Sequence, residues 1–242
     1  MNEFALGPWQ ELVPGIYRAV AQPESVNLGL VVGTESSLLV DTGSSPAQGR
    51  TIRDSVAMVT DRPLVVVALT HWHFDHAFGL AAFADVVTVA HESVPGRLRS
   101  PEAAAEAGRL GIAAEALGRP SRELVVATAF DLGSRRVEVA HLGRGHTDGD
   151  LVVVVPDADV VFAGDLIESA GPPSFGQDAV SDEWAGTLDG LVGLMTERTV
   201  AVPGHGDPVN REFVFSQRGE VAAHGADQRP AVLPNRPPLP LA

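Results

Sequence analysis

Four side chains that can bind metal ions stand close together in the first third of the sequence. They are His71, His73, Asp75 and His76, in the pattern His-x-His-x-Asp-His. In an extended segment, residues two apart project to the same side, so His71, His73 and Asp75 can face one cavity. Two imidazoles can then share one ion, while the carboxylate and the third imidazole remain for a second. The spacing predicts a metal site built from nitrogen and oxygen atoms.

Three further segments each offer one ligand after an apolar run or in a glycine-rich turn. The ligands are His146 in Gly145–Asp150, Asp165 in Phe162–Asp165 and His205 in Pro203–Asp207. Open sheets build their sites at the carboxyl ends of strands, so we expect these segments to meet the first motif. Taken alone, each is equally well explained as a residue that caps backbone amides in a turn.

Short apolar runs predict the strands that must position these ligands. They cover residues 16–20, 28–32, 37–40, 64–69, 86–90, 136–142, 150–155, 160–163 and 199–202. Helices are predicted over residues 46–59, 77–84, 101–117 and 182–195, and a last helix begins near Asn210. The almost purely apolar run 64–69 is typical of a strand buried on both faces, and it leads straight into the histidine motif.

The length and the distribution of proline predict one domain. At 242 residues the chain can form a single large domain, and we see no linker that would divide it. Five prolines accumulate from Arg229 onward, which suggests an extended segment. We therefore expect one domain over residues 1–228 and a proline-rich tail over residues 229–242.

The composition excludes several kinds of ligand, nucleophile and partner. The chain has no cysteine, which excludes thiolate ligands, a cysteine nucleophile and disulfides. All 17 basic residues are arginine, which excludes a lysine nucleophile or base. The net charge of −14 argues against a nucleic-acid partner, because phosphate binding needs a basic face. We expect a small-molecule substrate that is neutral or weakly charged.

The sequence also gives an expectation for the compartment. The N-terminal residues lack the basic start and apolar middle of a secretory signal. No run approaches the roughly 18 apolar residues that a membrane span needs. We therefore expect a cytoplasmic protein without a membrane partner, and the formation of a homodimer is left open.

The whole series of motifs resembles that of the metallo-β-lactamase-fold hydrolases, in the same order. The matching motifs are His71-x-His73-x-Asp75-His76, Gly145-His146-Thr147-x-Gly149-Asp150, Ala163-Gly164-Asp165 and Pro203-Gly204-His205-Gly206. The resemblance extends over about residues 15–217. It implies an α+β fold, a four-layer αββα sandwich in which two mixed β-sheets are flanked by helices and the metals lie at one edge.

The resemblance also implies a ligand set and a chemistry. It assigns the first ion to His71, His73 and His146, the second ion to Asp75, His76 and His205, and a bridging position to Asp165. The cofactors would be two divalent metal ions, zinc in the first place, with iron or manganese as alternatives. Three neutral imidazoles on zinc leave a position for water, whose pKa falls to about 7. A hydroxide shared by both ions would attack an acyl carbon, and Asp75 would carry a proton to the leaving atom.

Several nearby residues have two interpretations. Asp41 either orients the metal ligands through a hydrogen bond or caps a turn. Trp184, Phe175 and the Pro172–Pro173 pair either form a wall of the substrate pocket or belong to a plain surface loop.

The remaining aromatic residues and histidines are interpreted as structural. Trp72 and Phe74 alternate with the ligands, so we expect both to point away from them. Three histidines outside the motifs are interpreted as structural or surface residues: His91, His141 and His224.

Departures from other family members narrow the activity. Members that hydrolyse β-lactams commonly have cysteine or serine near the position of Asp165, and several bind the substrate carboxylate with lysine. The aspartate is similar to glyoxalase II, lactonases and other ester or thioester hydrolases. Only 37 residues follow His205, too few for the glutathione-binding domain of glyoxalase II. We therefore expect a hydrolase of a small ester, lactone or thioester.

Other functions compete with this one. A persulfide dioxygenase-like oxidoreductase would use a single iron at His71, His73 and Asp165, whereas retention of His76 and His205 favours two ions. A β-lactamase is a less favoured hydrolase. A non-catalytic binding protein that keeps the fold is disfavoured by the complete ligand set.

Overall fold

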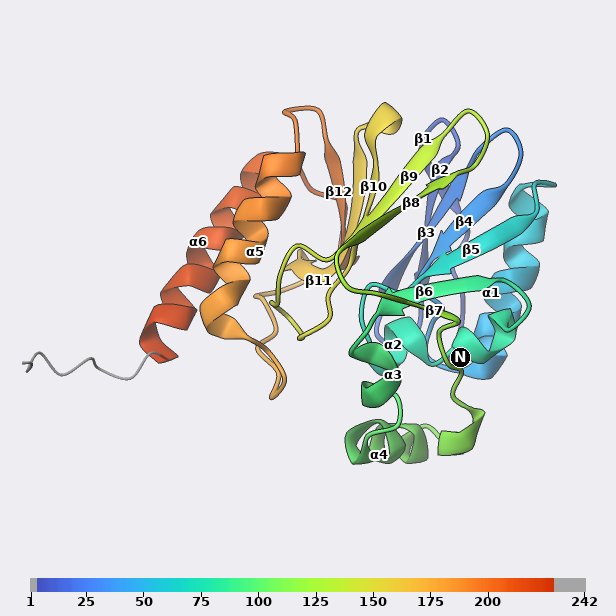
Figure 1. The fold of residues 1–242 in the computed structure, drawn as a ribbon, viewed down its shortest axis with the longest axis horizontal. Helices are drawn as coiled ribbons and strands as arrows, with labels where there is room; N and C mark the ends of the chain where they lie inside the picture. Colours follow the sequence, from blue (N-terminus) through green and yellow to red (C-terminus); the bar gives the residue numbers. More distant parts are fainter. Residues whose placement is uncertain (1–3, 229–242) are drawn as a thin grey trace, which may run out of the picture.

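The computed structural model describes residues 4–228, and the strands within them form one nearly closed mixed sheet (Figure 1). The strands are β1 (Gln10–Val13), β2 (Ile16–Ala21), β3 (Val26–Val32), β4 (Ser37–Val40), β5 (Leu64–Ala68), β6 (Val87–His91), β7 (Arg122–Leu124), β8 (Ala127–Asp131), β9 (Arg136–Ala140), β10 (Val152–Val155), β11 (Val160–Glu168) and β12 (Val200–His205). Their hydrogen-bonded order is β7-β6-β5-β4-β3-β12-β11-β10-β9-β8, with β2 paired to β3 and β1 to β2. The predicted proline-rich tail lies outside the described residues.

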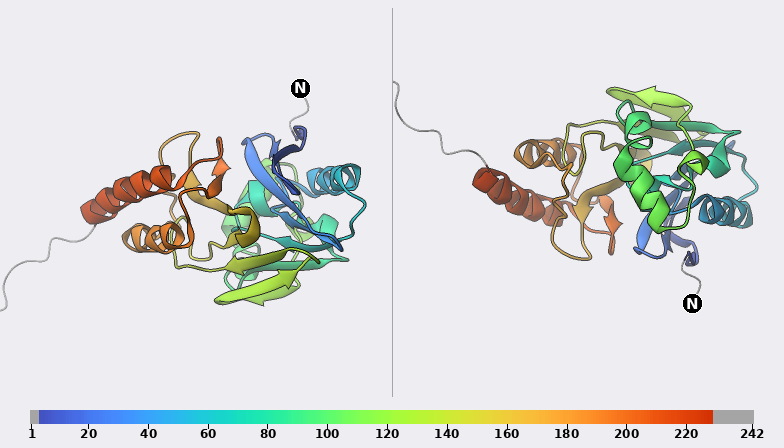
Figure 2. Two further views of the ribbon diagram at one scale, coloured as in Figure 1. Left: turned by 90° about the horizontal axis from the view of Figure 1, so that it is seen from above. Right: turned by 90° about the horizontal axis from the view of Figure 1, so that it is seen from below.

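Helices cover the outer faces of this sheet. They are α1 (Pro46–Val59), α2 (Phe74–Ala77), η1 (Leu80–Phe83), α3 (Val94–Arg97), α4 (Pro101–Arg109), η2 (Ala114–Ala116), η3 (Pro156–Ala158), α5 (Ser181–Leu194) and α6 (Arg211–Gln228). Helix α1 lies on one side of the molecule and the pair α5 and α6 on the other, in all three directions of view (Figures 1 and 2). None of the helices in residues 4–228 has both the length and the apolar character that crossing a membrane requires.

The two sheets expected from the sequence are joined into one. Strands β3 and β12 pair antiparallel at a single position, His205 with Val26. Neighbouring strands pair far more extensively, as β2 and β3 do along all of Ile16–Ala21. The β3–β12 contact arises because the two strands run side by side at this end of the molecule, where unpaired backbone groups would otherwise be left in the interior. The α+β layering with helices outside is retained.

The central core lies between the two halves of the sheet. Val31 and Leu38 from the first half pack with Val153 and Phe162 from the second half. Phe162 is only 3% exposed. Its ring occupies the space beside Gly29, where a Cβ atom would overlap the ring. A glycine in the middle of β3 therefore allows a large aromatic side chain to fill the space between the halves.

Helix α1 shows how local sequence defines the elements around the site. Ser45 caps it, because its side chain accepts a hydrogen bond from the amide of Gln48, and proline occupies the first helical position. Ile52 and Val56 form the buried face of the helix and pack on the outer side of β3, β4 and β5. The turn that precedes the helix is thereby fixed next to the histidine motif.

Two helix predictions are wrong in extent. The single helix expected over residues 101–117 ends as α4 at Arg109, and η2 follows separately. Gly111 lies directly after this end with a φ of 68°, a left-handed conformation that stops a helix. In place of the helix expected over residues 77–84 the chain forms the short 3-10 helix η1, and α2 before it shares only Ala77 with the expected range. Three short strands, β1, β7 and β8, were not predicted.

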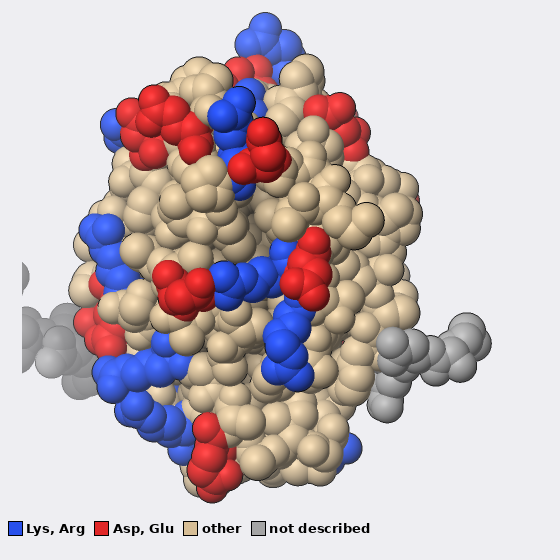
Figure 3. All heavy atoms as spheres, turned by 90° about the vertical axis from the view of Figure 1, so that its right-hand side faces the viewer, with Lys and Arg blue, Asp and Glu red and all other residues tan. Residues whose placement is uncertain are grey.

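The surface on the side of α1 has a mixed charge. Acidic and basic side chains lie near one another over much of this face, and a few basic side chains adjoin one another at its lower left (Figure 3). Many are paired, as Arg53 and Asp85 are through an Nη2–Oδ2 contact of 2.6 Å. Exposed pairs of this kind contribute little to stability.

The central core gives the first prediction. Replacing Phe162 with alanine leaves a cavity between the halves of the sheet, so we expect a loss of about 3–5 kcal/mol in the free energy of unfolding. Urea denaturation of the metal-free protein measures this. Phe215→Ala is the matched control, because Phe215 is 62% exposed on α6. Equal losses for both variants would contradict the packing described here.

Candidate metal centre

All seven side chains proposed as ligands from the sequence lie together at one end of the sheet. His71 and His73 lie in the segment between β5 and α2, whereas Asp75 and His76 belong to α2 itself. The sequence predicted an extended segment from His71 to Asp75. In the structure the extended part ends at His73, because the chain turns into a helix there. The other three are His146 in the loop between β9 and β10, Asp165 in β11 and His205 at the end of β12.

The first group contains three histidines and an aspartate. Donor atoms of His71, His73, His146 and Asp165 all lie within 4.8 Å of one another. His146 Nε2 lies 2.9 Å from His73 Nδ1 and 3.3 Å from Asp165 Oδ2. His71 Nε2 lies 3.8 Å from the same oxygen of Asp165. These four atoms face one small space, as the ligands of one cation would.

The second group lies directly beside the first. It contains Asp75, His76 and His205, whose donor atoms also lie within 4.8 Å of one another. His205 Nε2 is 3.2 Å from Asp75 Oδ2. Asp165 reaches this group as well, because its Oδ1 lies 3.1 Å from His76 Nε2 and its Oδ2 lies 3.6 Å from His205 Nε2. One carboxylate is thus in contact with both groups.

Each of the five histidines uses its other ring nitrogen in a contact outside the two groups. These contacts join His71 Nδ1 to Thr70 Oγ1 (3.1 Å), His73 Nε2 to Asp178 Oδ2 (3.2 Å), His76 Nδ1 to Asp41 Oδ2 (2.8 Å), His146 Nδ1 to the Ser174 carbonyl (3.1 Å) and His205 Nδ1 to the Glu24 carbonyl (2.9 Å). An acceptor behind an imidazole holds the proton on that nitrogen and leaves the lone pair of the opposite nitrogen facing inward. The rings are therefore oriented as metal ligands.

Asp41 is the acceptor behind His76. Its carboxylate also accepts hydrogen bonds from the amide of Thr70 at 2.7 Å and from the Thr70 hydroxyl at 2.8 Å. These partners are distant in sequence, so the contacts support the orienting role over a local turn cap. Asp41 has a φ of 63°, which is unfavourable for a residue with a side chain and is compensated by these contacts.

Buried polar atoms show that the two groups fit cations. Among the described residues, four buried side-chain atoms make no hydrogen bond, and three of them belong to the two groups: His71 Nε2, His76 Nε2 and Asp165 Oδ1, the fourth being Ser44 Oγ. His76 and Asp165 approach each other, but not with hydrogen-bond geometry. Leaving a buried polar group without a partner costs about 1–3 kcal/mol. A divalent cation in each group would satisfy all three atoms, and imidazole with carboxylate is a donor set that suits zinc.

The profile of the metallo-β-lactamase superfamily matches residues 21–205. The chain belongs to the metallo-β-lactamase superfamily. Among its relatives is a metallo-β-lactamase type 2 from Bacillus sp. (strain 170), 27% identical over 201 residues, covering 82% of this chain and 72% of that protein. Another is the bovine (Bos taurus) acyl-coenzyme A thioesterase MBLAC2, 27% identical over 220 residues, covering 78% of this chain and 76% of that protein. With both ligand groups present, this superfamily member is a metal-dependent hydrolase.

Solved structures show the same fold. The metallo-β-lactamase FIM-1 from Pseudomonas aeruginosa in its mono-zinc form superimposes with a TM-score of 0.75 at 22% identity, covering 93% of this chain and 98% of that one. A metallo-β-lactamase from Pontibacter korlensis gives a TM-score of 0.73 at 22% identity, covering 89% and 99%. At this identity the likeness concerns the fold alone.

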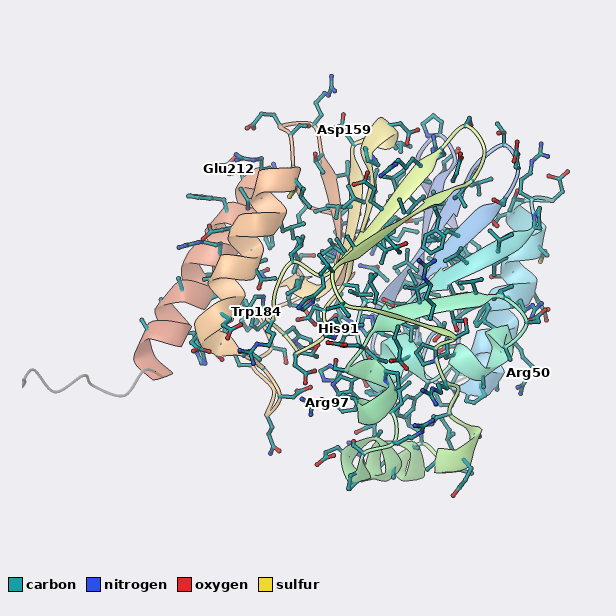
Figure 4. All side chains as sticks on the ribbon, viewed as in Figure 1. Arg50, His91, Arg97, Asp159, Trp184 and Glu212 are labelled. Carbon is teal, nitrogen blue, oxygen red and sulfur yellow. The ribbon has the colours of Figure 1, made fainter. Side chains whose placement is uncertain are left out.

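The proposed pocket wall is only partly where the sequence placed it. Trp184 is fully buried in α5, where it packs edge-on against His146 and donates a hydrogen bond to the Leu166 carbonyl, so neither interpretation of it is right (Figure 4). Helical packing after Val180 turns this side chain inward. Phe175 is half-buried and stacks on His224. Pro172 and Pro173 line a cavity of about 300 Å³ against α6.

The other histidines lie outside both groups. His91 is the last residue of β6, and its ring lies against that of His141 with centroids 4.3 Å apart. Phe74 begins α2 and packs on the cluster formed by α2, α3 and α4. Trp72 belongs to the same buried cluster, and its indole Nε1 donates to Asp178 Oδ2 at 2.8 Å, outside both ligand groups. Asp178 was missed from the sequence, since an aspartate in an irregular loop has no distinctive pattern.

The two groups differ in how they hold protons when no cation is bound. Burial lowers the pKa of His71 well below its usual value and that of His146 to about 4. Burial opposes protonation of His205 too, but the carboxylates of Asp165 and Asp75 beside its ring raise its pKa to about 10. The charges of Asp165, Asp75 and Asp41 likewise outweigh burial and raise the pKa of His76 well above its usual value.

These pKa shifts predict different pH dependences of metal binding. At neutral pH the second group is protonated and must release protons to bind a cation, whereas His71 and His146 are already neutral. Raising the pH from 6 to 9 should therefore strengthen Zn²⁺ binding at the second group by about tenfold per pH unit for each proton released. Binding at the first group should change much less. Chelator competition at several pH values measures both constants, and equal slopes would contradict the assignment.

Proposed function

We propose that this hydrolase uses two divalent metal ions, zinc first, to cleave a small ester, lactone or thioester. The observation that supports this most directly is the carboxylate of Asp165, which contacts both ligand groups. The chain has no cysteine that could supply a thiolate at this position. As the sequence resemblance implies, an aspartate here is typical of ester and thioester hydrolases and uncommon among members that hydrolyse β-lactams.

The geometry of the two groups supports the proposed ligand roles. We assign His71, His73 and His146 to the first ion, Asp75, His76 and His205 to the second, and Asp165 to both. When bound, the two ions would supply an ionised water and polarise the substrate carbonyl. Asp75 is 5% exposed and lies at the junction with His205. Its second carboxylate oxygen is available to take a proton and pass it to the leaving atom.

The relatives support acyl transfer to water as the reaction class. The bovine thioesterase is named for a thioester substrate, and the bacterial relatives are named as β-lactamases. The second name keeps β-lactam hydrolysis as the alternative function. The absence of lysine disfavours it, because several β-lactamases bind the substrate carboxylate with that residue. The acidic charge of this chain favours a neutral or weakly charged acyl substrate.

The ligand assignment predicts which of the two metal sites loses its ion in each variant. His205→Ala should abolish binding at the second group and leave the first occupied, because His205 contacts Asp75 and Asp165 but makes no contact with His71, His73 or His146 at the first group. Asp165→Asn and His73→Ala should lower total metal content and activity together. Elemental analysis of purified protein gives the stoichiometry. Wild-type metal content in Asp165→Asn would contradict the central position of this carboxylate.

A substrate panel tests the proposed reaction. The Zn²⁺-loaded protein should hydrolyse p-nitrophenyl acetate, a γ-lactone and a short-chain thioester faster than the β-lactam nitrocefin. Asp75→Asn should lower kcat by about 10²–10⁴-fold, because the proton carrier is lost, and measurement of metal content in the same variant separates this from loss of a ligand to the second ion. Comparing the short thioester with acetyl-coenzyme A tests whether a highly charged leaving group is disfavoured.

Three outcomes would contradict this proposal. Nitrocefin as the best substrate would indicate the β-lactamase alternative. Bound iron together with oxygen consumption on glutathione persulfide would indicate an oxidoreductase. Full metal loading without turnover of any compound in the panel would indicate a binding protein.

A further inference from the structure

The segment between β11 and α5, residues 169–180, lies against the metal centre from outside and is called the β11–α5 loop here. Its first residue, Ser169, donates its amide to the His205 carbonyl at 3.1 Å. Its last residue, Val180, donates its amide to the Gly145 carbonyl at 2.8 Å, next to His146. Both ends of the loop are thus held by segments that contain proposed metal ligands.

Two contacts in the middle of the loop go to the histidines themselves. The Ser174 carbonyl faces His146 Nδ1 at 3.1 Å, and Asp178 Oδ2 faces His73 Nε2 at 3.2 Å. The opposite nitrogens of these two rings, His146 Nε2 and His73 Nδ1, lie 2.9 Å apart inside the first group. The loop therefore contacts the outer side of the same two rings whose inner sides would hold the first ion.

Metal binding and loop contact require the same tautomers. A neutral imidazole has one proton, so a ring that gives its inner lone pair to a cation has its proton on the outer nitrogen. In that state His73 donates to Asp178 and His146 donates to the Ser174 carbonyl. When both rings are neutral and no cation is present, the short inner contact needs a proton on one inner nitrogen. That ring then has no proton to donate to the loop.

Asp178 is itself held firmly enough to orient His73. Its Oδ2 accepts a second hydrogen bond from Trp72 Nε1 at 2.8 Å, and Trp72 is 9% exposed. The same carboxylate oxygen of Asp178 thus lies within hydrogen-bond distance of two ring nitrogens, His73 Nε2 and Trp72 Nε1. A fixed carboxylate that accepts from the outer nitrogen of a ligand histidine raises the basicity of that ligand.

We propose that Asp178 is a positioning residue that links metal occupancy of the first group to the order of the β11–α5 loop. The link is reciprocal: the docked loop strengthens metal binding, and a bound cation holds the loop in place. The proposal rests on the first group being a metal site, as proposed above. The order of the β11–α5 loop would then depend on whether a cation is bound at the first group.

Metal affinity provides the first test. Zn²⁺ dissociation constants are measured by chelator competition for the full-length wild type, Asp178→Ala, Asp178→Asn and Trp72→Phe. Asp178→Ala should weaken binding at the first group by about 10–100-fold. Asp178→Asn retains an acceptor oxygen without the charge and should fall between that variant and the wild type. Asp182→Ala is the matched control, because it removes one exposed acidic side chain four residues further along and should bind Zn²⁺ as the wild type does.

Hydrogen exchange provides a second test that does not depend on activity. Adding Zn²⁺ to the metal-free wild type should slow amide exchange in residues 170–179, and this slowing should be absent in Asp178→Ala. Circular dichroism establishes that each variant is folded, and Asp178→Asn and Trp72→Phe keep the test decisive if Asp178→Ala does not fold.

The results separate two kinds of failure. A wild-type protein that binds no Zn²⁺ would overturn the proposed metal site itself. A wild type that binds Zn²⁺ normally, together with Asp178 variants of unchanged affinity or unchanged loop protection, would overturn only the role of Asp178.

Discussion

The contact of one buried carboxylate with two clusters of imidazoles is the constraint on which this structure depends. Asp165 can reach both clusters only because its surroundings leave room for it. A Cβ atom at Gly204 would overlap the Asp165 carboxylate, and Gly164 has a φ of 53° beside Thr70. The glycines next to the ligands are therefore required by close packing. The seven proposed ligands thus place carboxylate charges and imidazole lone pairs close together in the interior. A pair of bound cations would neutralise the charges and accept the lone pairs.

The fold also positions the hydrogen-bond acceptors on the outer side of the ligand histidines. The imidazoles are held from behind by acceptors on four different segments, including the Glu24 carbonyl in the turn between β2 and β3 and Asp41 at the end of β4. The unfavourable backbone conformation of Asp41 indicates that stability is given up at this point in favour of ligand orientation. The precision of the site thus comes from side chains and carbonyls that do not face the metals.

The sequence predicts the ligands better than their supports. The His71–His76 motif is recognisable because its donors are adjacent, and the series of motifs identifies the family. Asp178 has no such signal, because its contact with His73 depends on the path of an irregular loop. The β3–β12 pairing was not expected, since it arises only when two distant strands meet. The helix over residues 101–117 was overestimated because alanine-rich composition favours helix on both sides of Gly111, whose conformation ends it.

The junction between β3 and β12 has a consequence for the integrity of the molecule. The first half of the sheet and α2 supply His71, His73, Asp75 and His76, while the second half supplies His146, Asp165 and His205. Within the described residues the β3–β12 ladder between these halves has a single pair, at His205 itself, and a few backbone hydrogen bonds outside the strands, such as Leu151 amide to Thr70 carbonyl at 2.7 Å, also cross between them. Ions bound here would act as reversible cross-links in a chain that has no cysteine for disulfides, and their binding free energy would add to that of folding. The lifetime of the folded chain against proteases would then follow the supply of metal in its surroundings.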